Sequence, residues 1–186
     1  GFYATARWSM PTENGEFWLA FLRSLVARGL HGVELVTSDA HEGLKAAIAA
    51  TLSGASWQRC RVHCMRNVLA HVTRANAAEV MDLIRSIFVQ TTQEDAHLRL
   101  GEVVERLQGR HPRVAEMLIE AEEDLLAYTA FPTEHWRKIW STNPLERVNK
   151  EVKRRTDVVG IFPNEAAFEA HHTDIIDSLT TFKVLK

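Results

Sequence analysis

The chain has 186 residues, of which 46% are hydrophobic and 25% charged, the balance of a globular domain with its own core. The formal net charge of −2 excludes a polycation, so any surface for nucleic acid must be local. No apolar run reaches membrane-spanning length, and the two cysteines, Cys60 and Cys64, form no disulfide framework, so we expect a cytoplasmic protein.

Helices and strands alternate over the first third of the chain. After a possible strand in residues 1–12, the patterns predict a helix at residues 16–28, a strand at 33–37, a helix at 44–52 and a strand at 57–62. This order is typical of a parallel α/β sheet, in which functional groups follow the carboxyl ends of strands. Asp39 stands at such a strand end.

The middle of the chain, from residue 63 to residue 140, shows helical patterns only. Apolar spacing predicts four helices, around residues 68–72, 80–88, 98–107 and 114–128. We therefore expect three parts: a partial α/β core at residues 1–63, an all-helical insertion at 64–140, and a return to the core at 141–186. The last part begins with a helix, followed by a turn segment at residues 158–164 and a helix at 165–179.

The helix predicted after Ser141 carries the strongest functional signal. Asn143 is a suitable N-cap, and Pro144 a suitable first helical residue. Helical spacing puts the carboxylate of Glu146 on one face with an amide and two ammonium groups, those of Asn149, Lys150 and Lys153. Three arginines widen this basic surface: Arg147, Arg154 and Arg155. A carboxylate beside cations suits a metal ion and a phosphodiester.

A structural interpretation of the same helix stays open. Glu146 follows Asn143 by three residues, the position at which a capping-box partner closes the helix start. The pairs Glu146–Lys150 and Glu151–Arg155 have the spacing of ordinary ion pairs on a solvated helix face.

Asp39 and Glu146 together suggest metal chemistry. Glu146 follows Asp39 by 107 residues, but a strand-end aspartate and a glutamate on a packed helix can chelate divalent cations jointly. Two such ions, about 3.5–4 Å apart, activate an attacking oxygen and stabilise the leaving oxygen of a phosphodiester. Magnesium needs few carboxylates, because water and phosphate oxygens complete its shell.

Cys60 and His63 admit several interpretations. With Cys64 and His71 they have the elements of a zinc site, although a closed site needs four ligands at known spacing. A cysteine nucleophile with His63 as its base lacks a third, orienting group. We favour a buried strand cysteine and a hydrogen-bonding histidine near the active edge of the sheet.

Three blocks of sequence resemble the Mutator-type transposases of bacterial insertion sequences. The blocks are SDAHEGL at residues 38–44, CRVHCMRN at 60–67, and WRKIWSTNPLER at 136–147, the last continuing to GIFPN at 160–164. They occur in the family's order, and the resemblance covers roughly residues 15–165.

The resemblance implies a ribonuclease H-like catalytic domain with a helical insertion and an Asp-Asp-Glu metal triad. By position, Asp39 matches the second aspartate and Glu146 the glutamate, while Cys60 and His63 match the family's C-x2-H element. The implied cofactor is Mg²⁺ or Mn²⁺. The implied partner is DNA at the transposon ends and target, bound near the bacterial nucleoid by a homo-oligomer of the full-length protein. The DNA contacts would come from Arg66, Arg147, Asn149, Lys150, Lys153, Arg154 and Arg155.

One departure from the family pattern concerns the first aspartate of the triad. No acid precedes Glu13, so we expect a fragment that is truncated at the N-terminus, marginally stable and inactive alone. The parent would cleave DNA and transfer its strands. The alternatives are a non-catalytic DNA-binding or regulatory remnant that joins an intact transposase oligomer, and a purely structural helical protein.

Overall fold

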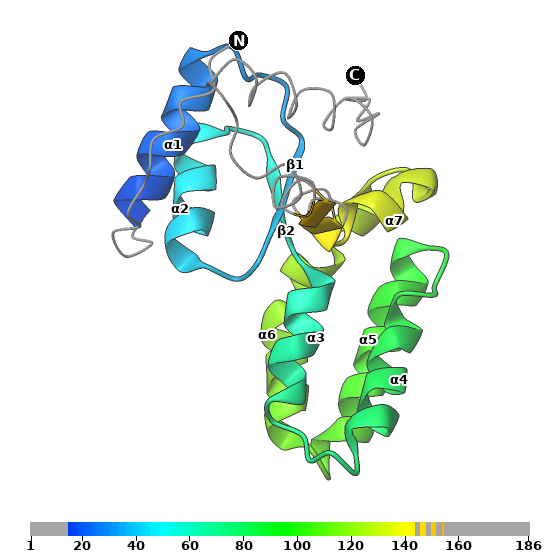
Figure 1. Cartoon of the computed structure of the whole chain (residues 1–186). Helices are drawn as coiled ribbons and strands as arrows, with labels where there is room; N and C mark the ends of the chain where they lie inside the picture. Colours follow the sequence, from blue (N-terminus) through cyan, green and yellow to red (C-terminus); the bar gives the residue numbers. More distant parts are fainter. Residues whose placement is uncertain (1–14, 144–145, 148–149, 152–153, 155–186) are drawn as a thin grey trace. The chain divides into compact units, whose positions relative to one another are not determined.

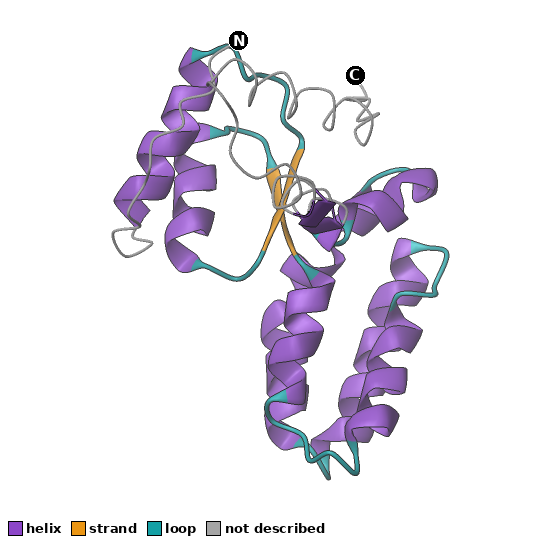
Figure 2. Cartoon of the chain, viewed as in Figure 1, coloured by secondary structure: helices purple, strands orange, loops and turns teal. Residues whose placement is uncertain are grey.

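The computed structural model describes residues 15–143, 146–147, 150–151 and 154. The chain divides into two compact units, one of residues 13–142 and one of residues 143–186 with residues 1–12. The described part is predominantly helical, with a small α/β portion (Figure 1 and Figure 2). The predictions for residues 1–12, 158–164 and 165–179 lie outside the described residues.

The larger unit opens with the predicted alternation of helix and strand. Its elements are α1 (Gly15–Ala27), β1 (Leu35–Ser38), α2 (Glu42–Thr51) and β2 (Ser56–Arg59). The two strands pair in parallel, with Leu35 opposite Ser56 and Ser38 opposite Arg59, so the predicted parallel α/β arrangement is confirmed. Gly29 and Gly54, at φ +103° and +88°, follow the ends of α1 and α2, because glycine adopts this conformation without strain.

A small core forms where α1 packs against α2. Its buried side chains are Leu22, Leu44, Ala47, Ile48 and Leu52. The helices approach closely at Gly15 and Gly43: a Cβ atom added to Gly43 would lie 2.8 Å from the Gly15 Cα atom and 2.9 Å from its nitrogen. Neither position has a side chain, and this permits the close backbone contact.

Four helices follow one another in the middle of the chain as predicted, but the first spans residues 61–69 and not residues 68–72. They are α3 (Arg61–Leu69), α4 (Ala77–Ile87), α5 (Gln93–Gln108) and α6 (Pro112–Leu126). Two short 3-10 helices, η1 (Ala127–Ala130) and η2 (Thr133–His135), then lead into α7 (Trp136–Ile139). Local signals set the boundaries of the longer helices: the Thr92 hydroxyl accepts a bond from the Asp95 N–H at 3.1 Å, and Pro112 opens α6. We call α3 to α7 the helical block.

The predicted second strand is too long. It was expected to run through Val62, whereas β2 ends at Arg59 and α3 begins at Arg61. The Arg61 N–H donates to the Trp140 carbonyl at 3.1 Å, and the Arg61 guanidinium carbon lies 3.6 Å from the Trp140 ring centroid. The strand therefore ends where Arg61 contacts Trp140, 79 positions away, and no local sequence pattern reveals this contact.

A buried glutamine joins the sheet to the helical block. The Gln58 amide nitrogen donates to the Leu125 carbonyl at 2.8 Å, and its oxygen accepts from the Tyr128 N–H at 2.7 Å. Nearby, Lys45 of α2 forms an ion pair of 2.6 Å with Asp124 of α6. The α/β elements and the helical block are therefore attached through side chains as well as through the connecting chain.

The second unit contributes the helix that was predicted after Ser141. Among its described residues, Asn143, Glu146, Arg147, Lys150, Glu151 and Arg154 are all helical. Because Asn143 is itself helical, the helix begins one residue earlier than the N-cap prediction placed it, a difference within the fraying of helix ends.

No helix in the described ranges combines the length and the apolar character needed to cross a membrane.

Candidate functional site

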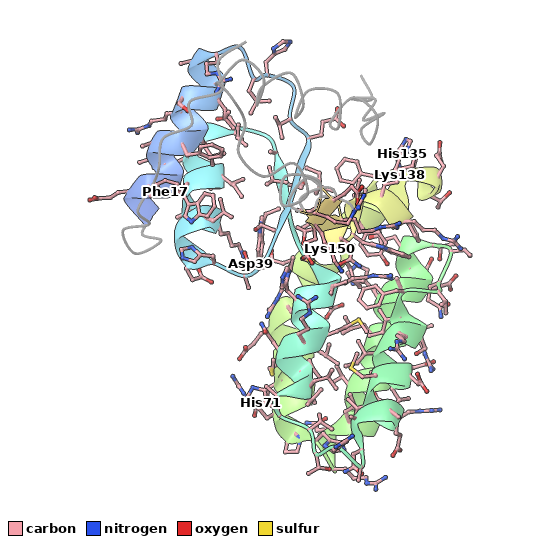
Figure 3. The ribbon with its side chains drawn as sticks, viewed as in Figure 1. Phe17, Asp39, His71, His135, Lys138 and Lys150 are labelled. Carbon is pink, nitrogen blue, oxygen red and sulfur yellow. The ribbon has the colours of Figure 1, made fainter. Side chains whose placement is uncertain are left out.

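Asp39 lies directly after β1, in the short connection to α2 (Figure 3). Its side chain is exposed, while the preceding Ser38 is buried. The Ser38 hydroxyl donates to the Asp39 carbonyl at 2.8 Å and accepts from the Trp57 indole nitrogen at 2.8 Å. Within the described residues the Asp39 carboxylate forms no ion pair. The strand end thus holds the backbone of Asp39 while leaving an exposed carboxylate available to a cation.

Cys60 lies between β2 and α3 and is fully buried. Its N–H donates to the Ser38 carbonyl at 2.6 Å, and its Sγ atom accepts from the Thr142 N–H at 3.4 Å. The burial was predicted, but the residue caps α3 rather than lying in the strand. One residue therefore links the end of β1 to the segment that leads into the Glu146 helix.

Two more hydrogen bonds hold that segment, residues 139–142, against the strand ends. The Thr37 hydroxyl donates to the Ile139 carbonyl at 2.5 Å, and the Arg61 N–H donates to the Trp140 carbonyl. With the Cys60–Thr142 contact, bonds from three positions fix the return of the chain to the sheet. Sequence patterns missed Thr37 and Thr142, because their partners lie 102 and 82 residues away.

The other half of the C-x2-H element lies on α3. His63 is half-buried and Arg66, one turn further on, is exposed. The described ranges contain no group of three or more His, Cys, Asp or Glu side chains placed to hold a metal ion, so the zinc alternative is not assembled there.

The cysteine-nucleophile alternative also lacks support. A reactive cysteine needs access and a stabilised thiolate. Cys60 and Cys64 are both buried, and burial raises the pKa of the Cys64 thiol, which favours the unreactive protonated form.

The described part of the Glu146 helix presents two half-buried carboxylates, those of Glu146 and Glu151, and several exposed cations. Glu146 is half-buried, and Arg147, Lys150 and Arg154 are exposed. Glu151 pairs with Arg154 through contacts of 2.7 and 2.9 Å, an ion pair on the helix surface. The predicted DNA contacts Asn149, Lys153 and Arg155 lie outside the described residues, as does the predicted partner of Glu151. Asp39 and Glu146 belong to different units, so their joint metal site stays a prediction.

Comparison with known proteins gives a consistent result. The sequence model described as "Transposase, Mutator family" matches residues 6–180. The transposase for insertion sequence element IS1081 of Mycobacterium tuberculosis is 54% identical over 155 residues, which are 83% of this chain and 37% of that protein. The transposase for ISRM5 of Rhizobium meliloti is 40% identical over 82% of this chain and 38% of its own length. The transposase for IS256 in transposon Tn4001 of Staphylococcus aureus is 34% identical over 83% of this chain and 40% of its own length.

The chain spans about two fifths of the length of the curated relatives it matches. The match of the family model over nearly all of the sequence, and the identities over more than four fifths of it, carry the assignment. This chain belongs to the Mutator family of transposases.

Proposed function

We propose that this chain is part of the catalytic domain of a metal-dependent DNA transposase with a ribonuclease H-like fold. The observation that carries the proposal is the bonding of Cys60 to both Ser38 and Thr142. Ser38 directly precedes Asp39, and Glu146 follows Thr142 by four residues. The two predicted ligands thus follow backbone positions that a single buried residue connects.

In this proposal Asp39 and Glu146 hold Mg²⁺ or Mn²⁺, and carboxylate oxygens are the ligands that these hard cations prefer. The bound ions would supply charge stabilisation for the attacking and leaving oxygens during DNA cleavage and strand transfer. Asp39 contributes an exposed carboxylate on a fixed backbone. The helix of Glu146 contributes the second carboxylate together with its neighbouring cations.

The basic residues of this helix bind the DNA backbone. Arg147, Lys150 and Arg154 are exposed, and each can neutralise a phosphate. We assign the same role to Arg66 on α3 and to Asn149, Lys153 and Arg155. Local cations of this kind reconcile DNA binding with a formal net charge of −2.

The full-length protein would act as a homo-oligomer. The relatives are more than twice as long as the matched region. The first aspartate of the triad would lie in the part of such a protein that this chain does not cover. The 186-residue chain alone would bind DNA without cutting it.

The test uses a full-length transposase that contains this chain. Replacing Glu146 by Gln or Asp39 by Asn should reduce strand transfer by at least about a hundred-fold while DNA binding persists, because the ligand charge is lost but the fold is kept. Glu151→Gln, on the same helix, is the matched control and should retain activity. Strand transfer that survives Glu146→Gln contradicts the assignment. Salt-dependent DNA binding without metal-dependent cutting, in the wild type as well, would favour the regulatory alternative.

A further inference from the structure

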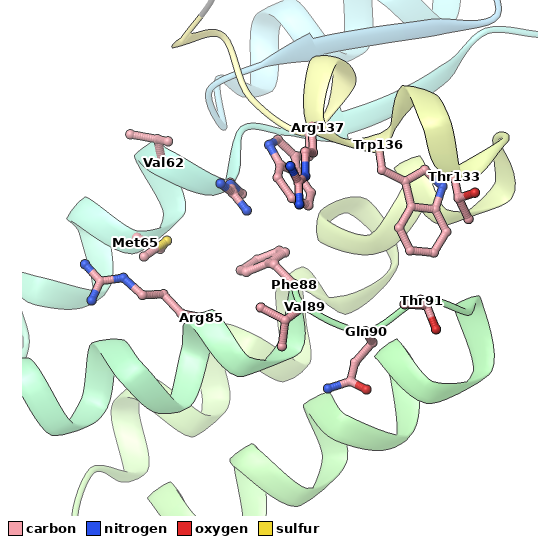
Figure 4. Close-up of a pocket in the computed structure, with 12 residues that line it drawn as sticks. Val62, Met65, Arg85, Phe88, Val89, Gln90, Thr91, Thr133, Trp136 and Arg137 are labelled. Carbon is pink, nitrogen blue, oxygen red and sulfur yellow. The ribbon is translucent and has the colours of Figure 1, made fainter.

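The helical block contains a cavity of about 650 Å³ near the start of α3 and the end of α4 (Figure 4). This volume lies within the range of about 300–1,000 Å³ that is usual for ligand pockets. Aromatic and cationic side chains dominate its lining: Phe88, Trp136, Trp140, Arg61, Arg85 and Arg137. This cavity has no role in the proposed metal site or in the DNA contacts assigned above.

Arg61 provides a planar cation in the wall of the cavity. Its guanidinium carbon lies 3.6 Å from the Trp140 ring centroid and 5.3 Å from that of Phe88. The side chain is half-buried, and burial lowers the pKa of its guanidinium group. A guanidinium held over an indole ring offers a planar group on which a nucleic-acid base can stack.

The aromatic side chains around Arg61 are held in place by one another. Trp140 packs edge-to-face against Phe88 and Tyr128, with ring centroids 6.2 and 5.6 Å apart. Trp136 packs in the same way against Tyr128, and its indole nitrogen donates to the Phe131 carbonyl at 2.7 Å. The cavity therefore needs little rearrangement to receive a flat ligand.

The charge of the cavity favours an anion. Three arginines and no acidic residue are among its lining side chains. Arg85 pairs with Asp82 at 2.9 Å, but both side chains are exposed and such pairs are weak. Neither Arg61 nor Arg137 forms an ion pair with any residue in the described ranges. Gln90, Thr91 and Thr133 add groups that can hydrogen-bond a base edge.

We propose that this cavity binds one unpaired nucleotide of DNA, with its base stacked on Arg61 and its phosphate bound by Arg137 and Arg85. The inference rests on the proposed function, since it takes DNA as the ligand. A base inside a duplex is unable to reach such a platform, whereas an unpaired or extruded base can. The site would hold a distorted or single-stranded position of the DNA.

The test measures binding of the 186-residue chain to three labelled DNA probes of equal length. One is a fully paired duplex, one is a forked duplex with an unpaired 2-aminopurine, and one is the same fork with an abasic site. Wild type should bind the 2-aminopurine fork at least about five-fold more tightly than the abasic fork, because stacking of a base contributes affinity. The 2-aminopurine fluorescence should fall on binding.

Two variants and one control locate the effect. Arg61→Gln should abolish the preference for the fork that contains a base, and Arg137→Gln should weaken binding of both forks by several-fold. Arg113→Gln removes an exposed arginine of α6 that pairs with Glu116 and should leave the preference unchanged. Circular dichroism checks the folding of each variant. Arg137 is exposed, so its variant remains informative if Arg61→Gln unfolds.

Several results would overturn the inference. Equal affinity for the two forks, with duplex binding intact, would remove the base site and leave the proposed function standing. A base preference that persists in folded Arg61→Gln would also contradict it, as would forks that bind equally to Arg137→Gln and wild type. Failure to bind any of the probes would contradict both proposals.

Discussion

Tyr128 shows how one buried group makes stability depend on pH. Its ring is fully buried, and its hydroxyl has no hydrogen-bond partner among the described residues. Burial raises the pKa of Tyr128 to about 12, although the charge of Arg61 partly opposes this. The folded chain therefore keeps a proton that the unfolded chain loses near pH 10.

We predict that the free energy of unfolding falls as the pH rises from about 10 to 12, by about 2–3 kcal/mol from this group. The contribution is complete below the unfolded pKa and is lost as the pH passes through the folded value. Tyr128→Phe should lack this part of the decline and should match wild type within about 1 kcal/mol at neutral pH, because the hydroxyl has no bond to lose. Denaturant unfolding of both proteins across this pH range is the measurement, and parallel pH curves would contradict the prediction.

A comparison of Cys60 with Cys64 separates a role in positioning the Glu146 helix from a role in core packing. Cys60→Ala removes the acceptor of the Thr142 N–H, whereas Cys64→Ala removes a sulfur atom from the core of the helical block. We predict a loss of about 1–3 kcal/mol of stability in each case. In a full-length transposase, only Cys60→Ala should also reduce strand transfer, by about ten-fold or more, because it frees the segment before Glu146. Equal activities at equal stability would show that Cys60 only fills space.

The position and burial of single residues were predictable from sequence where they depend on neighbouring residues in the chain. The strand-end position of Asp39 and the burial of Cys60 followed from the pattern of their neighbours. The roles of Gln58, Thr37 and Thr142 did not, since each depends on a partner at least 67 positions away: a backbone carbonyl for Gln58 and Thr37, and the Cys60 sulfur for Thr142.

At the scale of elements, the contact of α1 with α2 depends on two glycines. Gly43→Ala would place a methyl group 2.8 Å from the Gly15 backbone, and a backbone atom is unable to move aside cheaply. We predict a loss of about 1–3 kcal/mol. Gly101→Ala is the matched control: it lies within α5 with nothing within 4 Å, so the added methyl group should stabilise the helix by up to about 1 kcal/mol. Thermal unfolding of both variants tests the pair, and a Gly43→Ala variant as stable as wild type would show that the helices can separate.

The helices were predictable from sequence because apolar residues at helical spacing and turn residues at the boundaries agree. The strands were predictable in order and in pairing but not in length. The end of β2 is set by the contact of Arg61 with Trp140, and alternation alone does not distinguish Arg61 and Val62 from strand residues.

At the scale of the larger unit, successive segments of the chain form two hydrophobic cores of unequal size. Five buried residues form the described core of α1 and α2, and twenty form that of the helical block. Gln58 is the buried polar connection between them, since it lies on β2 and bonds to the backbone at Leu125 and Tyr128.

We predict that Gln58→Leu lowers the free energy of unfolding by about 2–4 kcal/mol, because it leaves buried backbone groups without a partner. It should also make α1 and α2 exchange their amide protons faster than the helical block, since the smaller core loses its support. Gln108→Leu, at an exposed position near the end of α5, should change stability by no more than about 0.5 kcal/mol. Hydrogen exchange measured segment by segment distinguishes the outcomes, and uniform acceleration across the chain would contradict the coupling.

The backbone bond between Arg61 and Trp140, at 3.1 Å, has an evolutionary consequence. It joins the two ends of the helical block, so a change of length within the block that keeps Leu125 and Tyr128 in place leaves the spacing of the outer elements unchanged. We therefore expect homologous proteins to tolerate changes of length in the loops between the helices of this block. For the same reason, a loop within the block, and not the junction itself, is the place to graft a foreign domain whose own termini lie close together.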